Sequence, residues 1–222
     1  MRPMPWSYTS LDDFVNCPKA FYEKRVIKSV VEEQSEQMLW GNQVHSAFEH
    51  YVKSGKSLPD ILQMHEPYLQ KLATLGDQRH TEKKIALNLK GKPCGFFDKD
   101  VWFRGVIDYH ALEGDTAHVV DYKTGKPHTK FEQLKLFALW ILSAYPHIDR
   151  VKTCFYWTQT MAQTSHIVER QSIPQVWGEF TPNLRQYAQA FKQDIWQPRQ
   201  SGLCNGWCPV TSCEFWKPKR RR

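Results

Sequence analysis

The chain has 222 residues, with 30 Lys and Arg residues against 23 Asp and Glu residues, and therefore a formal net charge of +7. Its content of apolar residues, 41%, is typical of a folded protein and not of a disordered one. The longest purely apolar run, Leu136–Leu142, is far shorter than the ~20 residues of a membrane span, and the first residues lack the apolar segment of a signal peptide. We therefore expect a folded, cytoplasmic protein without a membrane association.

The positive charge is concentrated at the C-terminus. Five of the six residues in Lys217–Arg222 are basic, so the rest of the chain is nearly balanced. Such a tail either contacts nucleic-acid phosphates or forms a solubilising end, and both interpretations stay open.

The hydrophobic periodicity predicts helices in the first third of the chain. The segment Thr9–Phe14 is expected to begin a helix with Thr or Ser at the N-cap, and Pro18 suits the first position of a second helix that continues to about Val26. A long helix is expected over Glu32–Lys53 and a further one over residues 58–75.

After residue 76 the pattern becomes typical of strands, with short β-branched and aromatic runs separated by turn residues. The expected elements, in chain order, are strands 84–89, 101–109 and 117–122, helix 131–145, strands 151–158 and 165–170, and helix 175–196. This order predicts an α/β fold with one mixed central sheet flanked by helices.

The densest group of chemically useful residues lies in Gly105–Lys126. Asp121 and Lys123 are two residues apart on one expected strand and share a face, and a turn at 113–115 would bring Asp108 beside Asp121. Two carboxylates at that distance repel each other unless a cation lies between them, and hard oxygen ligands suit Mg²⁺ or Mn²⁺. Such an ion would activate water against a phosphodiester, with Lys123 orienting the water or neutralising charge. The alternative is a surface hairpin with a weak Asp–Lys pair.

Two further segments flank this group. His45 and Glu49 are one helical turn apart on the long helix expected before it, and therefore share a face. Gln133 opens the helix that follows the Asp-Tyr-Lys strand.

The chain resembles the PD-(D/E)XK nuclease superfamily, specifically its RecB-like branch, which includes the CRISPR-associated RecB-like exonucleases and related phage nucleases. The resemblance covers residues 6–216 and implies a restriction-endonuclease-like core preceded by N-terminal helices. The motifs that carry it are Gly41-xxx-His45, Gly105-xx-Asp108, Asp121-Tyr-Lys123 and Gln133, after an opening Ser7-Tyr-Thr-Ser-Leu11 with Cys17-Pro18.

The resemblance implies a role for each motif residue. The metal ligands would be His45, Asp108, Asp121 and the backbone carbonyl oxygen of Tyr122, with Lys123 as the catalytic lysine and Gln133 supporting the site or the DNA backbone.

Some positions stand outside or depart from the family pattern. Glu49 and Glu82 are secondary candidates for contact with the metal. Phe137 stands where the family has a tyrosine, and Asp121 stands where glutamate is commoner.

Four of the six cysteines match a further feature of the branch. Cys17, Cys204, Cys208 and Cys213 correspond to the one N-terminal and three C-terminal cysteines that bind a 4Fe–4S cluster in related proteins. Three residues separate Cys204 from Cys208, whereas the tightest family pattern has two. Four thiolates also suit structural zinc, so zinc remains the alternative. Either group would join the two ends of the chain.

The expected function is that of a Mg²⁺- or Mn²⁺-dependent DNA nuclease, an exonuclease acting on DNA with single-stranded ends, in recombination or repair. The alternative is an inactive DNA-binding or assembly subunit with the same fold. A phage-encoded chain would act in the host cytoplasm. We expect one nuclease domain over residues 1–216, divided into N-terminal helices (1–30), a core (34–196) and a cysteine closure (197–216), with a basic tail at 217–222.

Overall fold

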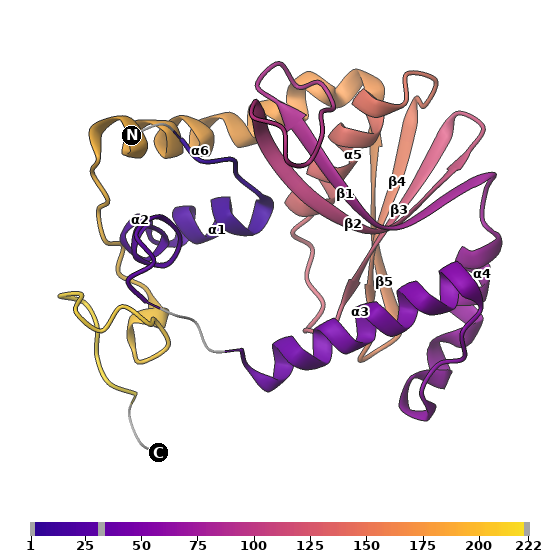
Figure 1. Cartoon of the computed structure of the whole chain (residues 1–222), viewed down its shortest axis with the longest axis horizontal. Helices are drawn as coiled ribbons and strands as arrows, with labels where there is room; N and C mark the ends of the chain where they lie inside the picture. Colours follow the sequence, from indigo (N-terminus) through magenta and orange to yellow (C-terminus); the bar gives the residue numbers. More distant parts are fainter. Residues whose placement is uncertain (1–2, 31–33, 220–222) are drawn as a thin grey trace. The chain divides into compact units, whose positions relative to one another are not determined.

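The structure is a computed structural model that describes residues 3–30 and 34–219 (Figure 1). The chain divides into two compact units. The sheet unit is Ser35–Val176, and the cysteine unit combines Met1–Gln34 with Trp177–Arg222.

Two of the predictions concern residues outside the described ranges. These are the start of the long helix at Glu32 and the arginines of the basic tail at 220–222. The part of that helix that is described, α3, spans Glu36–Ser54 and is capped by the side chain of Ser35.

A five-stranded mixed sheet forms the centre of the sheet unit. The strand order is β1-β2-β3-β4-β5, and neighbouring strands are antiparallel except for the parallel pair β3 and β4. The predicted mixed sheet is therefore confirmed. The strands are β1 (Gln78–Asn88), β2 (Val101–Glu113), β3 (Thr116–Lys123), β4 (Arg150–Trp157) and β5 (Ala162–Glu169).

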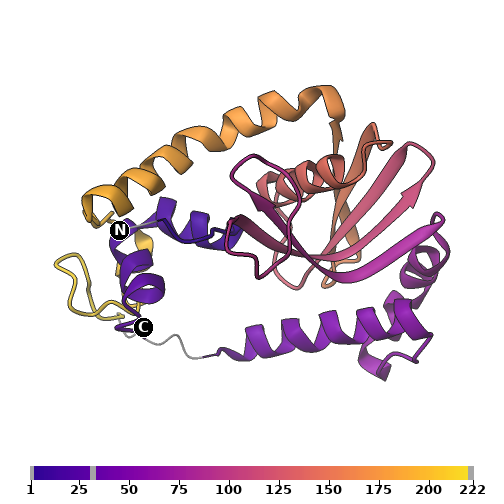
Figure 2. The same cartoon turned by 45° about the horizontal axis from the view of Figure 1, so that its top comes forward.

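Helices cover both faces of this sheet (Figures 1 and 2). Val44 and Phe48 of α3 join Leu69 and Leu72 of α4 (Glu66–Thr74) in a core built against Tyr109 and its neighbours on one face. Helix α5 (Glu132–Ala144) connects β3 to β4, and eight of its residues are buried. Even so, no helix in the described ranges is long and apolar enough to cross a membrane.

An aromatic cluster forms the core of the cysteine unit. The ring of Phe21 lies 5.4 Å from Tyr187 and 5.9 Å from Trp196, and Phe14 lies 5.3 Å from Tyr187, measured between ring centroids. The helices that carry or adjoin these rings are α1 (Tyr8–Asn16), α2 (Pro18–Phe21), which continues as a π-helical turn (Tyr22–Val26), and α6 (Ile173–Gln193).

Three of the differences between the secondary structure and the sequence-based expectation have a local physical reason. The N-cap of α1 is Ser7, not a residue within Thr9–Phe14, because the Ser7 side chain and backbone exchange hydrogen bonds with Ser10. The helix expected over 58–75 is divided into a 3-10 segment (Asp60–His65) and α4, whose first turn contains a proline that has no N–H to continue an α-helical ladder. Strand β1 begins six residues before the expected start. The sequence pattern does not reveal these residues as a strand, because they are polar and show no alternation.

Candidate active site

The two acidic residues expected to act together lie where β2 and β3 separate. The strands pair from Tyr109 to Glu113 on β2, and Asp108 and Asp121 are the next residues beyond the paired region on their respective strands. Both residues are buried, with 7% and 2% exposure. Here the N–H of Tyr122 donates to Oδ2 of Asp108 at 2.7 Å, so a side chain takes the place of a ladder partner. The hairpin brings the two acids to one place.

The backbone of Tyr122 contributes a carbonyl oxygen on the same side. In a strand, the N–H and C=O of one residue point toward the same neighbouring strand. The N–H of Tyr122 faces Asp108 on β2, whereas the next carbonyl, that of Lys123, faces β4 and accepts from the N–H of Thr158 at 2.8 Å. The carbonyl of Tyr122 is therefore directed toward β2 and Asp108.

Lys123 and Gln133 form a closed triangle with Asp121. Nζ of Lys123 lies 2.5 Å from Oδ2 of Asp121 and donates to Oε1 of Gln133 at 2.9 Å. Nε2 of Gln133 in turn donates to Oδ1 of Asp121 at 2.8 Å. The Lys123 ammonium also lies 5.2 Å from the centroid of the Phe155 ring, within the range of a cation–π interaction. These contacts hold the ammonium in one position.

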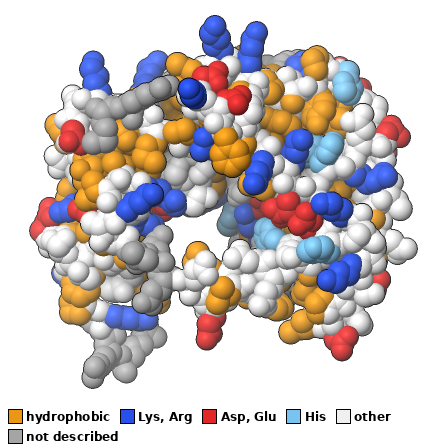
Figure 3. Space-filling model, in the orientation of Figure 1, with side chains coloured by type: hydrophobic (Ala, Val, Ile, Leu, Met, Phe, Trp, Pro, Cys, Tyr) orange, Lys and Arg blue, Asp and Glu red, His pale blue; other side chains and the backbone are white. Residues whose placement is uncertain are grey.

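A second group of ligand atoms converges on Asp108 from α3 and β1. Nδ1 of His45 lies 3.3 Å from Oδ1 of Asp108 and 3.9 Å from Oε1 of Glu82. One ligand atom from each of the three residues lies within 4.8 Å of the others. Val44 is buried against the sheet, which places its neighbour His45 at the edge of the core. Figure 3 shows acidic side chains gathered beside histidine and lysine side chains on this face of the sheet unit.

Glu82 reaches this group through an unusual backbone conformation. Its φ is +46°, in the left-handed region that non-glycine residues rarely adopt. Its neighbours Thr81 and Lys83 pair with Tyr109 and Ile107, so Glu82 stands opposite Asp108 on β2. The sequence offered Glu82 only as a secondary candidate, because no local pattern indicates a left-handed residue within a strand.

The electrostatics of the site favour bound positive charge. Burial lowers the pKa of His45, but the nearby carboxylates of Asp108 and Glu82 outweigh it and raise the pKa to about 10. Burial raises the pKa of Asp121 above its usual range, and the nearby Asp108 carboxylate adds to this effect against the opposing Lys123 ammonium. Without a metal ion, the site therefore takes up protons that a divalent cation would displace.

The donor set fits a divalent cation. It combines carboxylate oxygens, a backbone carbonyl and one imidazole, which are the ligands that Mg²⁺ and Mn²⁺ accept. Oδ2 of Asp121 is buried 2.5 Å from the Lys123 ammonium, which offsets the cost of burying this charged oxygen.

Two other residues named in the sequence analysis lie outside this group. Glu49 forms an ion pair with Lys53 at 3.8 Å and does not join the cluster of His45, Glu82 and Asp108. The ring of Phe137 is buried, and a Cβ at Gly105 would lie only 3.0 Å from it. Glycine at 105 thus allows α5, and with it Gln133, to approach β2.

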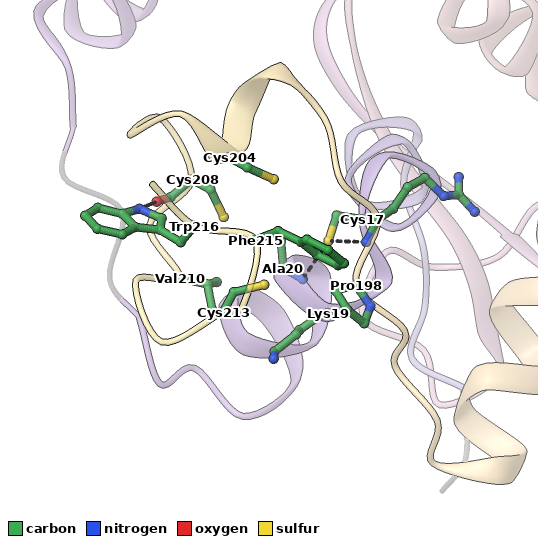
Figure 4. A pocket seen from close by; sticks show the side chains of 11 residues that line it. Cys17, Lys19, Ala20, Pro198, Cys204, Cys208, Val210, Cys213, Phe215 and Trp216 are labelled. Carbon is green, nitrogen blue, oxygen red and sulfur yellow. Dashed lines mark hydrogen bonds between the residues drawn. The ribbon is translucent and has the colours of Figure 1, made fainter. Parts of the chain in front are cut away.

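The four cysteines expected to bind a cluster line one pocket in the cysteine unit. The thiols of Cys17, Cys204, Cys208 and Cys213 point toward a common space (Figure 4). Backbone N–H groups donate to two of the sulfur atoms: those of Ala20 and Arg199 to Cys17, and that of Ser201 to Cys204. No disulfide joins any two of the six cysteines, all of which lie in the described ranges. Donors of this kind stabilise thiolate ligands.

The spacing of the four sulfur atoms distinguishes a single zinc ion from a larger metal cluster. Four thiolates around one zinc ion lie about 3.8 Å apart, since each Zn–S bond is ~2.3 Å and the geometry is tetrahedral. No three of the sulfurs of Cys17, Cys204, Cys208 and Cys213, all within the described ranges, lie within 4.8 Å of one another. Burial raises the pKa of the Cys208 thiol, and the other three cysteines raise it further. The thiols surround a space wider than a closed zinc site.

Comparisons with known proteins agree with this geometry. The family model of the PD-(D/E)XK nuclease superfamily matches residues 5–213. A solved structure of a candidate exonuclease from Eubacterium rectale is similar, with 12% identity and a TM-score of 0.55 over 91% of this chain and 86% of that one. The structure of the protein SSO0001 is also similar, with 15% identity and a TM-score of 0.52 over 95% of this chain and 85% of that one. No protein with a curated description matches the sequence.

Proposed function

Because the chain belongs to the PD-(D/E)XK nuclease superfamily, we propose that it is a metal-dependent DNA nuclease that removes nucleotides from DNA ends. Membership of the superfamily supports a hydrolase acting on nucleic acid. The preference for DNA ends comes from the resemblance to the RecB-like branch, and a structural neighbour described as a candidate exonuclease agrees with it. The single observation that carries the proposal is the convergence of Asp108, Asp121 and a fixed Lys123 in the middle of the sheet, where β2 and β3 separate.

Five groups would hold the metal. They are His45, Glu82 and Asp108, whose ligand atoms lie within 4.8 Å of one another, together with Asp121 and the carbonyl of Tyr122 beside that group. A bound Mg²⁺ or Mn²⁺ would lower the pKa of a water molecule and polarise a phosphoryl oxygen.

Lys123 is the proposed catalytic lysine. Its ammonium lies between the Asp121 carboxylate and the Gln133 amide, which fix it beside the acidic group. From that position it donates a hydrogen bond to the attacking water or to a phosphoryl oxygen as negative charge develops there. Gln133 is a positioning residue, because it holds both the lysine and the carboxylate.

The test is a cleavage assay on end-labelled single-stranded and duplex DNA, linear and circular, with Mg²⁺, Mn²⁺ or chelator. We expect metal-dependent cleavage of linear DNA that is lost in Asp121→Ala and Lys123→Ala. Asp115→Asn is the matched control, since Asp115 is an exposed acid at the turn between the same two strands. Full activity of purified Lys123→Ala, or cleavage in excess chelator, would remove the proposed site.

One observation favours the alternative, an inactive DNA-binding or assembly subunit. Phe137 has no hydroxyl group where the family has a tyrosine, so any hydrogen bond of that phenol is lost. DNA binding without cleavage under every metal condition would support this alternative. The retention of His45, Asp108, Asp121 and Lys123 together favours the enzyme.

We further propose that the four cysteines hold a 4Fe–4S cluster with a structural role in the cysteine unit. The wide spacing of their sulfur atoms supports iron–sulfur over zinc, while the backbone donors to Cys17 and Cys204 suit thiolates bound to either group. Protein purified without oxygen should be brown and contain iron and sulfide, and Cys208→Ser should lose both. A colourless protein with one zinc ion per chain would contradict the iron–sulfur assignment.

A further inference from the structure

Two adjacent aromatic rings stand out on the loop between β1 and β2. Phe97 is 78% exposed, the largest exposure of any large hydrophobic residue in the described ranges. Phe96 is half-buried and lies 5.1 Å from Phe97, with the two rings at 78° to each other. One ring thus supports the other while the outer ring remains open to solvent.

Two cations flank both rings. Nζ of Lys84 lies 5.8 Å from each ring centroid, and Cζ of Arg104 lies 5.2 Å from Phe96 and 5.9 Å from Phe97. Most of these distances are near the outer limit of a cation–π interaction, so the contacts are weak and leave the ring accessible. We call Lys84, Phe96, Phe97 and Arg104 the aromatic patch.

The cations of the aromatic patch are not neutralised by carboxylates. The side chains of Lys84 and Arg104 form no ion pair or hydrogen bond with another residue in the part of the chain that the structure describes, and Nε of Arg104 is buried without a hydrogen-bond partner. The two acids of the loop are engaged locally: Asp98 accepts from the N–H of Gly95 at 2.7 Å, and Asp100 lies 3.4 Å from the amide of Asn88. Between residues 83 and 104 there are six basic and two acidic residues.

The aromatic patch is joined to the candidate active site by two strands. Lys84 is two residues from Glu82 on β1, and Arg104 is four residues from Asp108 on β2. At ~3.3 Å per residue these separations are about 7 and 13 Å. A single strand that reached the acidic cluster could therefore pass the aromatic patch within a few nucleotides.

We propose that the aromatic patch binds an unpaired segment of the nucleic-acid substrate, with a base stacked on Phe97 and backbone phosphates contacting Lys84 and Arg104. Exposed aromatic rings between cations are the chemistry by which proteins hold single strands without sequence preference. Duplex DNA offers phosphates but no free base face, so only unpaired strands gain the stacking contribution. The proposal rests on the proposed action on nucleic acid and names the form of substrate that the site takes.

The test measures the binding of a fluorescent oligothymidylate to the full chain by anisotropy in the presence of chelator, so that no hydrolysis occurs. Phe97→Ala should weaken binding by about 5- to 150-fold, the equivalent of about 1–3 kcal/mol per stacked base. Phe97→Trp should retain the affinity. Leu89→Ala is the matched control, since Leu89 is 75% exposed on the same loop but has no aromatic ring, and it should change binding less than twofold.

The outcomes separate this proposal from the nuclease assignment. Binding that depends on Phe97 in a chain that cleaves no DNA would support the aromatic patch and contradict the hydrolase. If the chain cleaves DNA but Phe97→Ala binds oligothymidylate as tightly as the wild type, the proposal for the aromatic patch is overturned and the nuclease assignment stands. The aromatic patch would also be overturned if Phe97→Ala lost as much affinity for blunt duplex DNA as for oligothymidylate. The same holds if the variant lost binding to anionic lipid vesicles but kept its affinity for oligothymidylate.

Discussion

The protonation of His45 leads to a quantitative prediction about the metal-free protein. The nearby carboxylates of Asp108 and Glu82 raise the pKa of His45 from 6.5 to about 10. A group whose pKa is higher in the folded state stabilises the fold fully below its unfolded pKa. The stabilisation from His45 should therefore be complete below pH 6.5 and lost as the pH rises to about 10.

The size of the effect follows from the shift and the exposure of the ring. At ~1.4 kcal/mol per pKa unit, a shift from 6.5 to about 10 sets an upper limit of ~5 kcal/mol. The His45 side chain is 30% exposed, and solvent screening reduces the expected loss to roughly 1–3 kcal/mol. For a chain of this length the corresponding fall in melting temperature is roughly 2–12 °C.

The assay is denaturant unfolding with chelator at several pH values between 6 and 10, followed by tryptophan fluorescence. His45→Asn is the control, because asparagine keeps a polar group but binds no proton, and its stability should fall less over this range. Saturating Mn²⁺ should remove the fall in the stability of the wild-type protein with rising pH, since the ion replaces the proton. If, without metal, the stability of the wild type and of His45→Asn fell by the same amount between pH 6 and 10, the reasoning would be refuted.

Three further predictions concern the residues around this group. Gln133→Ala should lower the cleavage rate by about 10- to 100-fold with little change in KM for DNA, because Lys123 loses the acceptor that positions it; an unchanged rate would remove Gln133 from the site. Gly105→Ala should lower the unfolding free energy by about 1–2 kcal/mol, since its Cβ would lie 3.0 Å from Phe137, and Phe137→Leu should recover part of the loss in denaturant unfolding. At pH 10 and above, where His45 has lost its proton and no longer attracts Glu82, Glu82→Gly should raise the stability of the metal-free protein by about 1 kcal/mol by relieving its left-handed backbone, yet weaken Mn²⁺ binding in calorimetry; a loss of stability at that pH would contradict the strain.

Much of the secondary structure could be predicted because it depends on short-range patterns. The β-branched and aromatic runs predicted β3 and β4. The helical spacing of Leu39, Val44, Phe48, Tyr51 and Val52 predicted the apolar face of α3, of which Val44 and Phe48 are buried while Leu39 is exposed. The start of β1 could not be predicted in this way, because its first residues are polar and only pairing with β2 makes them a strand.

The candidate site shows the same division. The sequence by itself determined that Asp121 and Lys123 share a face, because alternation along a strand is a local property, and that a short turn would return Asp108 to them. Only the tertiary structure decided that β2 and β3 separate at Asp108, that Gln133 closes a triangle with the lysine, and that Glu82 meets His45. These contacts join residues on different elements, and they depend on sheet twist, helix packing and one left-handed backbone angle, which no local pattern of side chains encodes.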